Sequence, residues 1–171
     1  MSILSTSDFV GTFQLAVNQY NEDSFSTFFE KMERQYLVRL LGAELYGLFY
    51  ADLSGTPSVP TNPIYTAIFN KMEFDNGYIF ISEGMKEMLK GFVFYEWVKE
   101  NQLYDTIAGM VTNNIENANS QAGTTVGAQY ILNKFNEAMV TFEAIQEYIK
   151  LHISNYPDFN GCKIYKSPVF W

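Results

Sequence analysis

Residues 131–152, which read ILNKFNEAMVTFEAIQEYIKLH, form the most regular pattern of apolar residues in this 171-residue chain. Six apolar residues and one histidine recur there at alternating intervals of four and three: Ile131, Phe135, Ala138, Phe142, Ile145, Ile149 and His152. This spacing predicts a helix of about 35 Å with a single apolar seam. Such a seam packs against a partner helix, which lies either within the domain or in another subunit.

Other helices are predicted on the N-terminal side of this stretch. Residues 24–41 alternate apolar and charged residues at helical spacing, and Gly42 follows as the cap before a second helix over residues 43–53. A short helix is predicted from Asn62-Pro63 to Met72, and a helix apolar on most faces over residues 82–101. We therefore expect an all-α fold, a small bundle of about five helices, with the helix at residues 82–101 in its centre.

Two short segments between these helices lack a helical pattern. Residues 54–61 contain Gly and Pro and are predicted to form a loop. Residues 75–77, Asp-Asn-Gly, predict a turn, and residues 78–81 a brief extended piece.

A long polar stretch with one charged residue, residues 112–129, separates the two most apolar helices. Connections longer than about a dozen residues are uncommon in compact domains and are usually functional or disordered. This one lacks the charge of a solvated linker and the cations and aromatic residues that suit nucleic acid. It is either a surface loop or an arm that orders against a neighbouring subunit, and we expect a protruding loop over about residues 104–129.

The C-terminal segment, residues 156–171, is rich in aromatic residues and begins at the proline, Pro157, that ends the last helix. So apolar a terminus is expected to dock on its own body or on another chain. Gly161 and Pro168 suit an extended reach, which favours another chain. The sequence thus predicts one helical domain, residues 1–155, and an extended aromatic tail, residues 156–171.

The charge balance restricts the classes of partner. Lys and Arg number 11 against 19 Asp and Glu, a formal net charge of −8, and no polybasic run exists. A protein that binds nucleic acid or an anionic membrane needs a basic face, which this sequence does not provide.

No run of about 18 apolar residues predicts a membrane span, and the first residues lack the features of a signal peptide. The aromatic fraction of 17% gives a large apolar surface, of the kind enriched in protein interfaces.

Motifs for catalysis or for metal and cofactor binding are not found, so we predict no catalytic residue, no metal and no cofactor. Two carboxylate pairs are spaced one helical turn apart, Glu83 with Glu87 and Glu143 with Glu147. Such pairs can serve acid–base chemistry, although a solvated charged face explains them better.

The single histidine and the single cysteine are the remaining candidates for reactive groups. His152 falls on the apolar seam, which favours a packed and hydrogen-bonded role. Cys162 lies beside Lys163, which can lower a thiol pKa, but no histidine base is near it in the sequence.

The order of these segments resembles a known family. Residues 8–11, DFVG, and residues 33–46, ERQYLVRLLGAELY, resemble the opening of the head–tail connector (adaptor) proteins of tailed bacteriophages. There a helix that ends in a Leu-Gly step runs straight into a helix that begins with a Leu-Tyr pair. A later part of the chain is similar to a related group from phages of Bacteroides-like hosts, on SEGMK at residues 82–86, FVFYEW at residues 92–97, Thr106, GMV at residues 109–111 and EN at residues 116–117. The similarity covers roughly residues 8–120, and the order and spacing of the motifs carry it.

This resemblance implies a structural virion protein of the neck, without enzymatic activity. Such a connector is a helical bundle that forms a ring of about twelve copies below the portal and continues the DNA channel towards the tail or a further neck ring. DNA passes through the lumen without specific binding, no membrane is involved, and assembly takes place in the host cytoplasm before the protein resides at the head–tail junction of the virion. Subunits of the family join through a protruding loop and terminal segments. The predicted contacts with subunits or portal are therefore Thr106, Gly109, Val111, Asn113, Asn114, Glu116, Asn117, Asn119, Gln121, Thr124, Tyr156, Phe159, Tyr165, Phe170 and Trp171.

Two other functions fit the same composition. A small acidic phage-encoded protein that binds or inhibits a host factor would share the charge but need no symmetry. A hydrolase using one of the carboxylate pairs is the third and weakest alternative.

Overall fold

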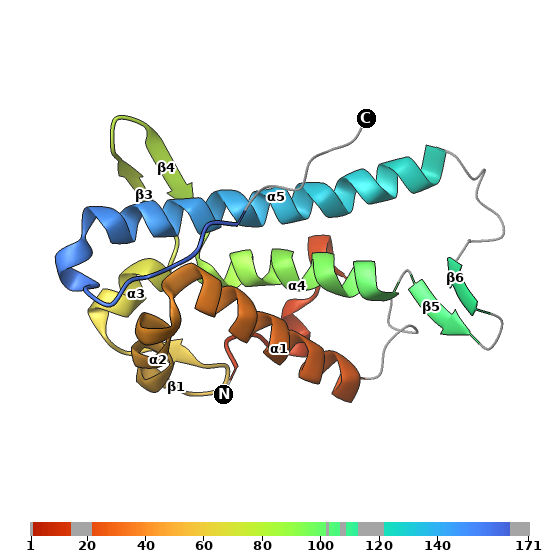
Figure 1. Cartoon of the computed structure of the whole chain (residues 1–171), viewed down its shortest axis with the longest axis horizontal. Coiled ribbons are helices and arrows are strands. Elements are labelled where there is room, and N and C mark those ends of the chain that lie inside the picture. The colour runs from red at the N-terminus through yellow and green to blue at the C-terminus, as the bar shows by residue number, and fades with distance from the viewer. Residues whose placement is uncertain (1, 15–21, 102, 107–108, 113–121, 165–171) are drawn as a thin grey trace.

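Three helices run side by side and form the body of the protein (Figure 1). The structure is a computed structural model that describes residues 2–14, 22–101, 103–106, 109–112 and 122–164. Helix α4 (Met85–Asn101) lies between α1 (Glu22–Leu41) and α5 (Ala122–Leu151) and packs against both. Its position confirms the central role expected from its apolar sequence.

The apolar seam of α5 faces α4 within the same chain. Phe135 and Phe142 are buried, and both rings contact the ring of Phe92 on α4, at centroid distances of 5.4 and 6.1 Å. A Cβ atom at Gly91 would lie 2.8 Å from the Cβ atom of Ala138, so glycine lets the two helices approach closely. The partner of the seam is therefore a helix of this domain and not of another subunit.

Around this body lie shorter elements at one end (Figure 1). Gly42, with φ of +86°, joins α1 directly to α2 (Ala43–Asp52), as the sequence indicated. Helix α3 (Pro63–Phe69) begins with proline and is capped by the Asn62 side chain, which accepts a hydrogen bond from the backbone N–H of Ile64. Leu48 of α2 faces solvent at 50% exposure. The N-terminal segment adds two short 3-10 helices, Thr6–Asp8 and Gly11–Phe13, and a third, Ile153–Asn155, follows α5.

Three antiparallel pairs of strands correct the expectation of an all-α fold, although the chain is predominantly helical. The pairs are β1 (Leu53–Ser54) with β2 (Val59–Pro60), β3 (Met72–Asp75) with β4 (Ile79–Ser82), and β5 (Leu103–Thr106) with β6 (Gly109–Thr112). Strands of two to four residues are too short for a period of two to stand out in the sequence. Helix α3 was expected to reach Met72, but it ends at Phe69, and β3 begins at Met72.

The predicted protruding loop over residues 104–129 was wrong as a continuous loop. The β5–β6 hairpin covers residues 103–112, and α5 begins at Ala122, well before Ile131. Figure 1 places this hairpin at the opposite end of the body from the β3–β4 hairpin. Residues 113–121 lie outside the described part of the chain.

The first part of the C-terminal tail lies on the body and completes the end of α1. In this part of the tail, the backbone N–H of Asn160 donates to the carbonyl oxygen of Leu41 at 3.2 Å, and that of Cys162 donates to the carbonyl oxygen of Arg39 at 2.7 Å. The carbonyl oxygen of Leu40 accepts from the side chain of Gln146 at 3.1 Å. The last carbonyl groups of a helix have no partner within the helix, and here other segments of the chain supply them.

The same docking buries the first aromatic residue of the tail. Tyr156 is 1% exposed, and its hydroxyl donates to the carbonyl oxygen of Ile64 at 2.7 Å. Phe159 and Ile164 pack against the core from partly buried positions. The expectation that the tail reaches another chain was therefore wrong for residues 156–164, and residues 165–171 lie outside the described residues.

Candidate functional site

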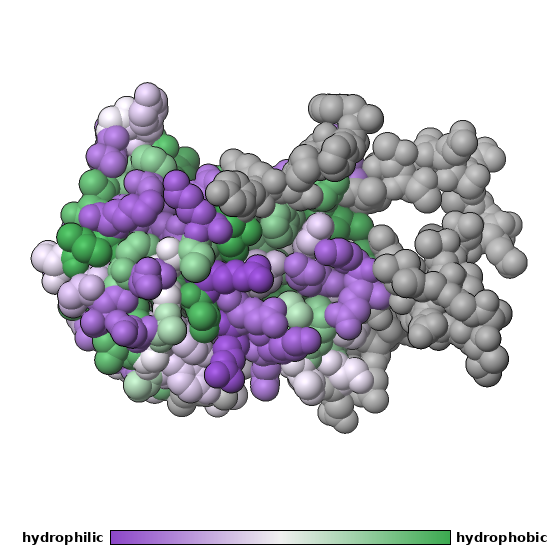
Figure 2. Space-filling model, viewed as in Figure 1, coloured by the Kyte–Doolittle hydropathy of each residue, from purple (hydrophilic) through white to green (hydrophobic). Residues whose placement is uncertain are grey.

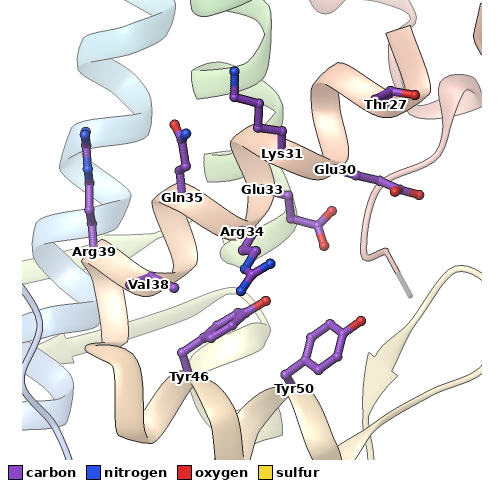
Figure 3. A pocket seen from close by; sticks show the side chains of 10 residues that line it. All are labelled: Thr27, Glu30, Lys31, Glu33, Arg34, Gln35, Val38, Arg39, Tyr46 and Tyr50. Atoms are coloured by element: carbon purple, nitrogen blue, oxygen red, sulfur yellow. The ribbon is translucent and has the colours of Figure 1, made fainter. Parts of the chain in front are cut away.

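An open groove of about 910 Å³ runs between α1 and α2 (Figure 3). The turn at Gly42 brings the two helices side by side, so that one face of each lines the groove. Its lining residues are Thr27, Glu30, Lys31, Glu33, Arg34, Gln35, Val38 and Arg39 from α1 and Tyr46 and Tyr50 from α2.

The groove combines aromatic rings with cations. Tyr46 and Tyr50 lie one turn apart on α2, with ring centroids separated by 5.7 Å, and both point towards α1. Arg34 extends between the two helices towards these rings, whereas Lys31 and Arg39 extend from the other side of α1 (Figure 3). All three cations are exposed.

The exposed charge of this groove is opposite in sign to that of the whole chain. Three cations stand against one exposed carboxylate, Glu30, while the chain carries −8. Arg34 and Arg39 are the two arginines of the whole sequence. Among the described residues neither they nor Lys31 form an ion pair within 4.0 Å. The groove therefore offers the guanidinium group of Arg34, with Lys31 and Arg39 on the other side of α1, to a ligand that carries carboxylates or other anionic groups.

Glu33, at the wall of the groove, is occupied by the protein itself. Its carboxylate is 4% exposed and accepts hydrogen bonds from the backbone N–H groups of Ile3 and Leu4 and from the hydroxyl of Ser2, at 2.8 to 3.1 Å. Burial raises the pKa of Glu33, and these hydrogen bonds oppose that effect. The residue clamps the N-terminal segment onto α1, which is a structural role.

The outer face of the β3–β4 hairpin forms a second exposed surface of mixed character. The strand register places Glu73 opposite Ile81 and Asp75 opposite Ile79, so all four side chains lie on one face. Ile79 is 68% exposed and Tyr78, in the turn, 80%. In Figure 2, hydrophobic residues lie along the strands of this projecting hairpin below its tip, whereas hydrophilic side chains gather over α1.

The inner face of the hairpin is anchored on α5. The rings of Phe74 and Phe80 stack at 5.2 Å, and Phe74 meets the ring of Tyr148 edge to face at 5.5 Å. This packing holds the hairpin on the body while its outer face remains exposed.

Three carboxylates of the two predicted pairs form ion pairs. Glu83 bonds Lys71 at 2.7 Å, Glu87 pairs with Lys90, and Glu147 pairs with Lys150. Glu83 also lies outside the helix it was assigned to, because α4 begins at Met85 after Gly84, which has φ of +94°. A charged surface explains this arrangement without acid–base chemistry.

The remaining candidates for chemistry have structural surroundings. The ring of His152 stacks on Tyr148 at 4.2 Å, and its Nδ1 lies 2.9 Å from the carbonyl oxygen of that residue. The thiol of Cys162 is exposed and free. Among the residues that the structure describes, no group of three or more His, Cys, Asp or Glu could hold a metal ion. In the same part of the chain, the helices are too short or too polar to span a bilayer.

The predicted interface residues fall into three groups. Thr106 of β5 pairs with Gly109 of β6, Val111 lies two residues further along β6, and Thr124 lies in the first turn of α5. Tyr156 and Phe159 pack on the protein's own core. Nine residues lie outside the described part of the chain: Asn113, Asn114, Glu116, Asn117, Asn119, Gln121, Tyr165, Phe170 and Trp171.

Sequence reasoning missed both the groove and the outer face of the hairpin. One feature of the sequence points to the groove: both arginines lie within six residues of each other on a helix, and a tyrosine-bearing helix follows. A second feature points to the hairpin: acidic and aromatic residues alternate over residues 73–75, directly before Asn76-Gly77.

Comparison of the chain with known protein families, curated proteins and solved structures returned no match.

Proposed function

We propose that this protein is a structural subunit of the neck of a tailed bacteriophage, a connector that forms a ring of about twelve copies between portal and tail. The observation that carries the proposal is the junction at Gly42. The resemblance to the connector family rests on a Leu-Gly step between two helices. In this chain α1 ends at Leu41, and α2, with its Leu45-Tyr46 pair, begins at Ala43.

The shape of the surface supports a role in assembly. The molecule projects two hairpins from opposite ends of a helical body (Figure 1), and one of them exposes apolar side chains. Exposed apolar surface next to charged residues is typical of a protein interface. The described cavities are open grooves.

The negative charge suits a wall that surrounds DNA. Acidic side chains repel the phosphate backbone, so DNA slides past such a wall without being held. Only charges within a Debye length of the lumen, about 8 Å at physiological ionic strength, act in this way.

The test is to add the full-length protein to purified portal rings of the same phage and to average end-on views by electron microscopy. We expect an additional layer with rotational symmetry, and a mass increase of about twelve subunits by native mass spectrometry. Portal rings without added protein are the control. A portal that gains no layer in the presence of excess protein contradicts the proposal and leaves a host factor as the partner to seek.

A further inference from the structure

The groove between α1 and α2 and the outer face of the β3–β4 hairpin have complementary chemistry. The groove presents Tyr46 and Tyr50 beside Arg34, with Lys31 at its edge. The hairpin presents apolar side chains beside carboxylates and has no cation over residues 72–82. Each surface therefore offers what the other lacks, apolar contact together with opposite charge.

The two carboxylates on the outer face of the hairpin lack an ion pair with any residue that the structure describes. Glu73 and Asp75 are exposed and form no ion pair among the described residues, whereas Glu83 at the base of the hairpin is bound to Lys71. The cations of the groove are likewise outside every ion pair of the described residues. Opposite charges left unpaired on two surfaces of one protein can pair between copies.

The dimensions of the two surfaces agree. The groove follows α1 from Thr27 to Arg39, about 18 Å at a rise of 1.5 Å per residue. Each strand of the hairpin has four residues, about 13 Å at 3.3 Å per residue. The hairpin is thus short enough to lie along the groove.

The two surfaces cannot meet within one molecule. The hairpin projects from the side of α5, and α1 and α2 lie on the other side of α4 (Figure 1). A contact between different surfaces of two copies is head-to-tail, and repetition of such a contact generates a ring when the rotation closes.

We infer that the β3–β4 hairpin of one copy seats in the α1–α2 groove of the next copy. Tyr78 and Ile79 lie against Tyr46 and Tyr50, and Glu73 and Asp75 face Arg34. This contact builds on the ring assembly proposed above and names the two surfaces that form it.

Cross-linking tests the contact directly. In a Cys162→Ser background, cysteines replace Tyr50 in the groove and Ile79 on the hairpin, and a short bismaleimide is applied to concentrated protein and to protein bound to portal. A matched control replaces Tyr50 and Val140, which is 48% exposed on α5. We expect at least about tenfold more cross-linked dimer and higher ladder for the groove–hairpin pair than for the control pair.

A charge exchange tests the pairing of the polar groups. Arg34→Glu is expected to lower the cross-linked fraction by about tenfold, and Glu73→Lys with Asp75→Lys to restore it in the same chain. All three positions are exposed, and an unchanged circular dichroism spectrum checks that each variant folds. A loss that the compensating changes do not restore overturns the assignment of these charges.

The outcomes separate this inference from the proposed function. A new layer on the portal without excess groove–hairpin cross-linking overturns the inference and leaves the connector function standing. Excess cross-linking in solution without a layer on the portal supports the inference and contradicts the connector function. Equal cross-linking of the two pairs in both samples overturns the inference.

Discussion

Two extended segments of this protein differ in whether they pack on the body of the molecule or project from it. Residues 156–164 lie on their own body, with Tyr156 buried and backbone N–H groups bound to the end of α1. Residues 72–82 project as a hairpin whose outer face exposes Tyr78 and Ile79. Both segments are rich in aromatic residues, so hydrophobicity alone does not tell which one is available to a partner. The difference is that the tail meets helix carbonyl groups that need donors, whereas the two strands of the hairpin pair with each other.

The largest effect is expected at Tyr156. Tyr156→Ala removes a fully buried ring and should lower the free energy of unfolding by about 3–5 kcal/mol. Tyr156→Phe keeps the ring and loses only the hydrogen bond to Ile64, a cost of about 1 kcal/mol. Urea unfolding followed by circular dichroism measures both. If Tyr156→Ala is as stable as the wild type, the tail is not part of the folded body.

Glycines at the contact between tail and α1 give the next largest effect. A Cβ atom at Gly161 would clash with the carbonyl oxygen of Leu40 and lie 2.7 Å from Nε2 of Gln146. Gly161→Ala should therefore destabilise the protein by about 1–3 kcal/mol. Gly47, inside α2, has no atom within 4 Å of such a Cβ, and Gly47→Ala should stabilise by about 0.5–1 kcal/mol. Equal effects of the two changes in thermal unfolding would show that residue 161 does not touch α1.

A third segment, the N-terminus, is fastened by carboxylates, and its stability should depend on pH. Burial raises the pKa of Asp8, but the hydrogen bond and charge of Lys86 and the hydrogen bonds from Ser5 outweigh burial and leave it below its ordinary value of 3.8. Because the folded state favours the ionised form, this contribution is present above pH 3.8 and is lost as the pH falls through the folded pKa. Asp8→Asn should remove it, which unfolding curves between about pH 2 and 6 would measure. A difference between wild type and variant that stays constant over this range argues against the ion pair.

Glu33 should show the opposite dependence. Its pKa is raised above 4.5, mainly by burial, so the folded state favours the protonated form. Its contribution to stability therefore decreases as the pH rises from 4.5 through the raised pKa, and Glu33→Gln should abolish that decrease. The same unfolding curves measure it. A contribution that grows over this interval would show that the hydrogen bonds outweigh burial.

The smallest effect is expected on the hairpin. Tyr78→Ser should change the free energy of unfolding by no more than about 0.5 kcal/mol, because the side chain is 80% exposed. Urea unfolding measures this change beside that of Tyr156→Ala. A large loss of stability at residue 78 would place the hairpin tip within the core and remove the contrast between the two segments.

The sequence predicted the helical elements well where a repeating pattern was long. Helices α1, α4 and α5 were expected within a few residues at most ends, and the cap at Asn62-Pro63 and the junction at Gly42 were both correct. The N-terminal end of α5 was missed because Gly123 and Gly127 and neighbouring polar residues hide the helical period. The extended piece predicted at residues 78–81 corresponds to β4, whereas the other short strands were missed because two to four residues give too few alternations to detect.

The site was predicted less well, because it depends on contacts between distant segments. Nothing near Tyr156 in the sequence indicates that its hydroxyl meets Ile64, 92 positions away. The charged character of the α1–α2 groove likewise depends on which face of α1 meets α2. A tail and a hairpin of similar composition therefore could not be distinguished before the tertiary contacts were known.

Amide hydrogen exchange, measured by mass spectrometry on the protein alone and bound to portal rings, tests this account most directly. Residues 156–164 should be protected in both states at the backbone N–H groups of Tyr156, Phe159, Asn160 and Cys162, which are bound within the monomer. Residues 72–82 and the groove face of α1 and α2 should gain protection only in the assembly. Rapid exchange of residues 156–164 in the isolated protein, or unchanged exchange of the hairpin in a ring that has formed, would contradict the account.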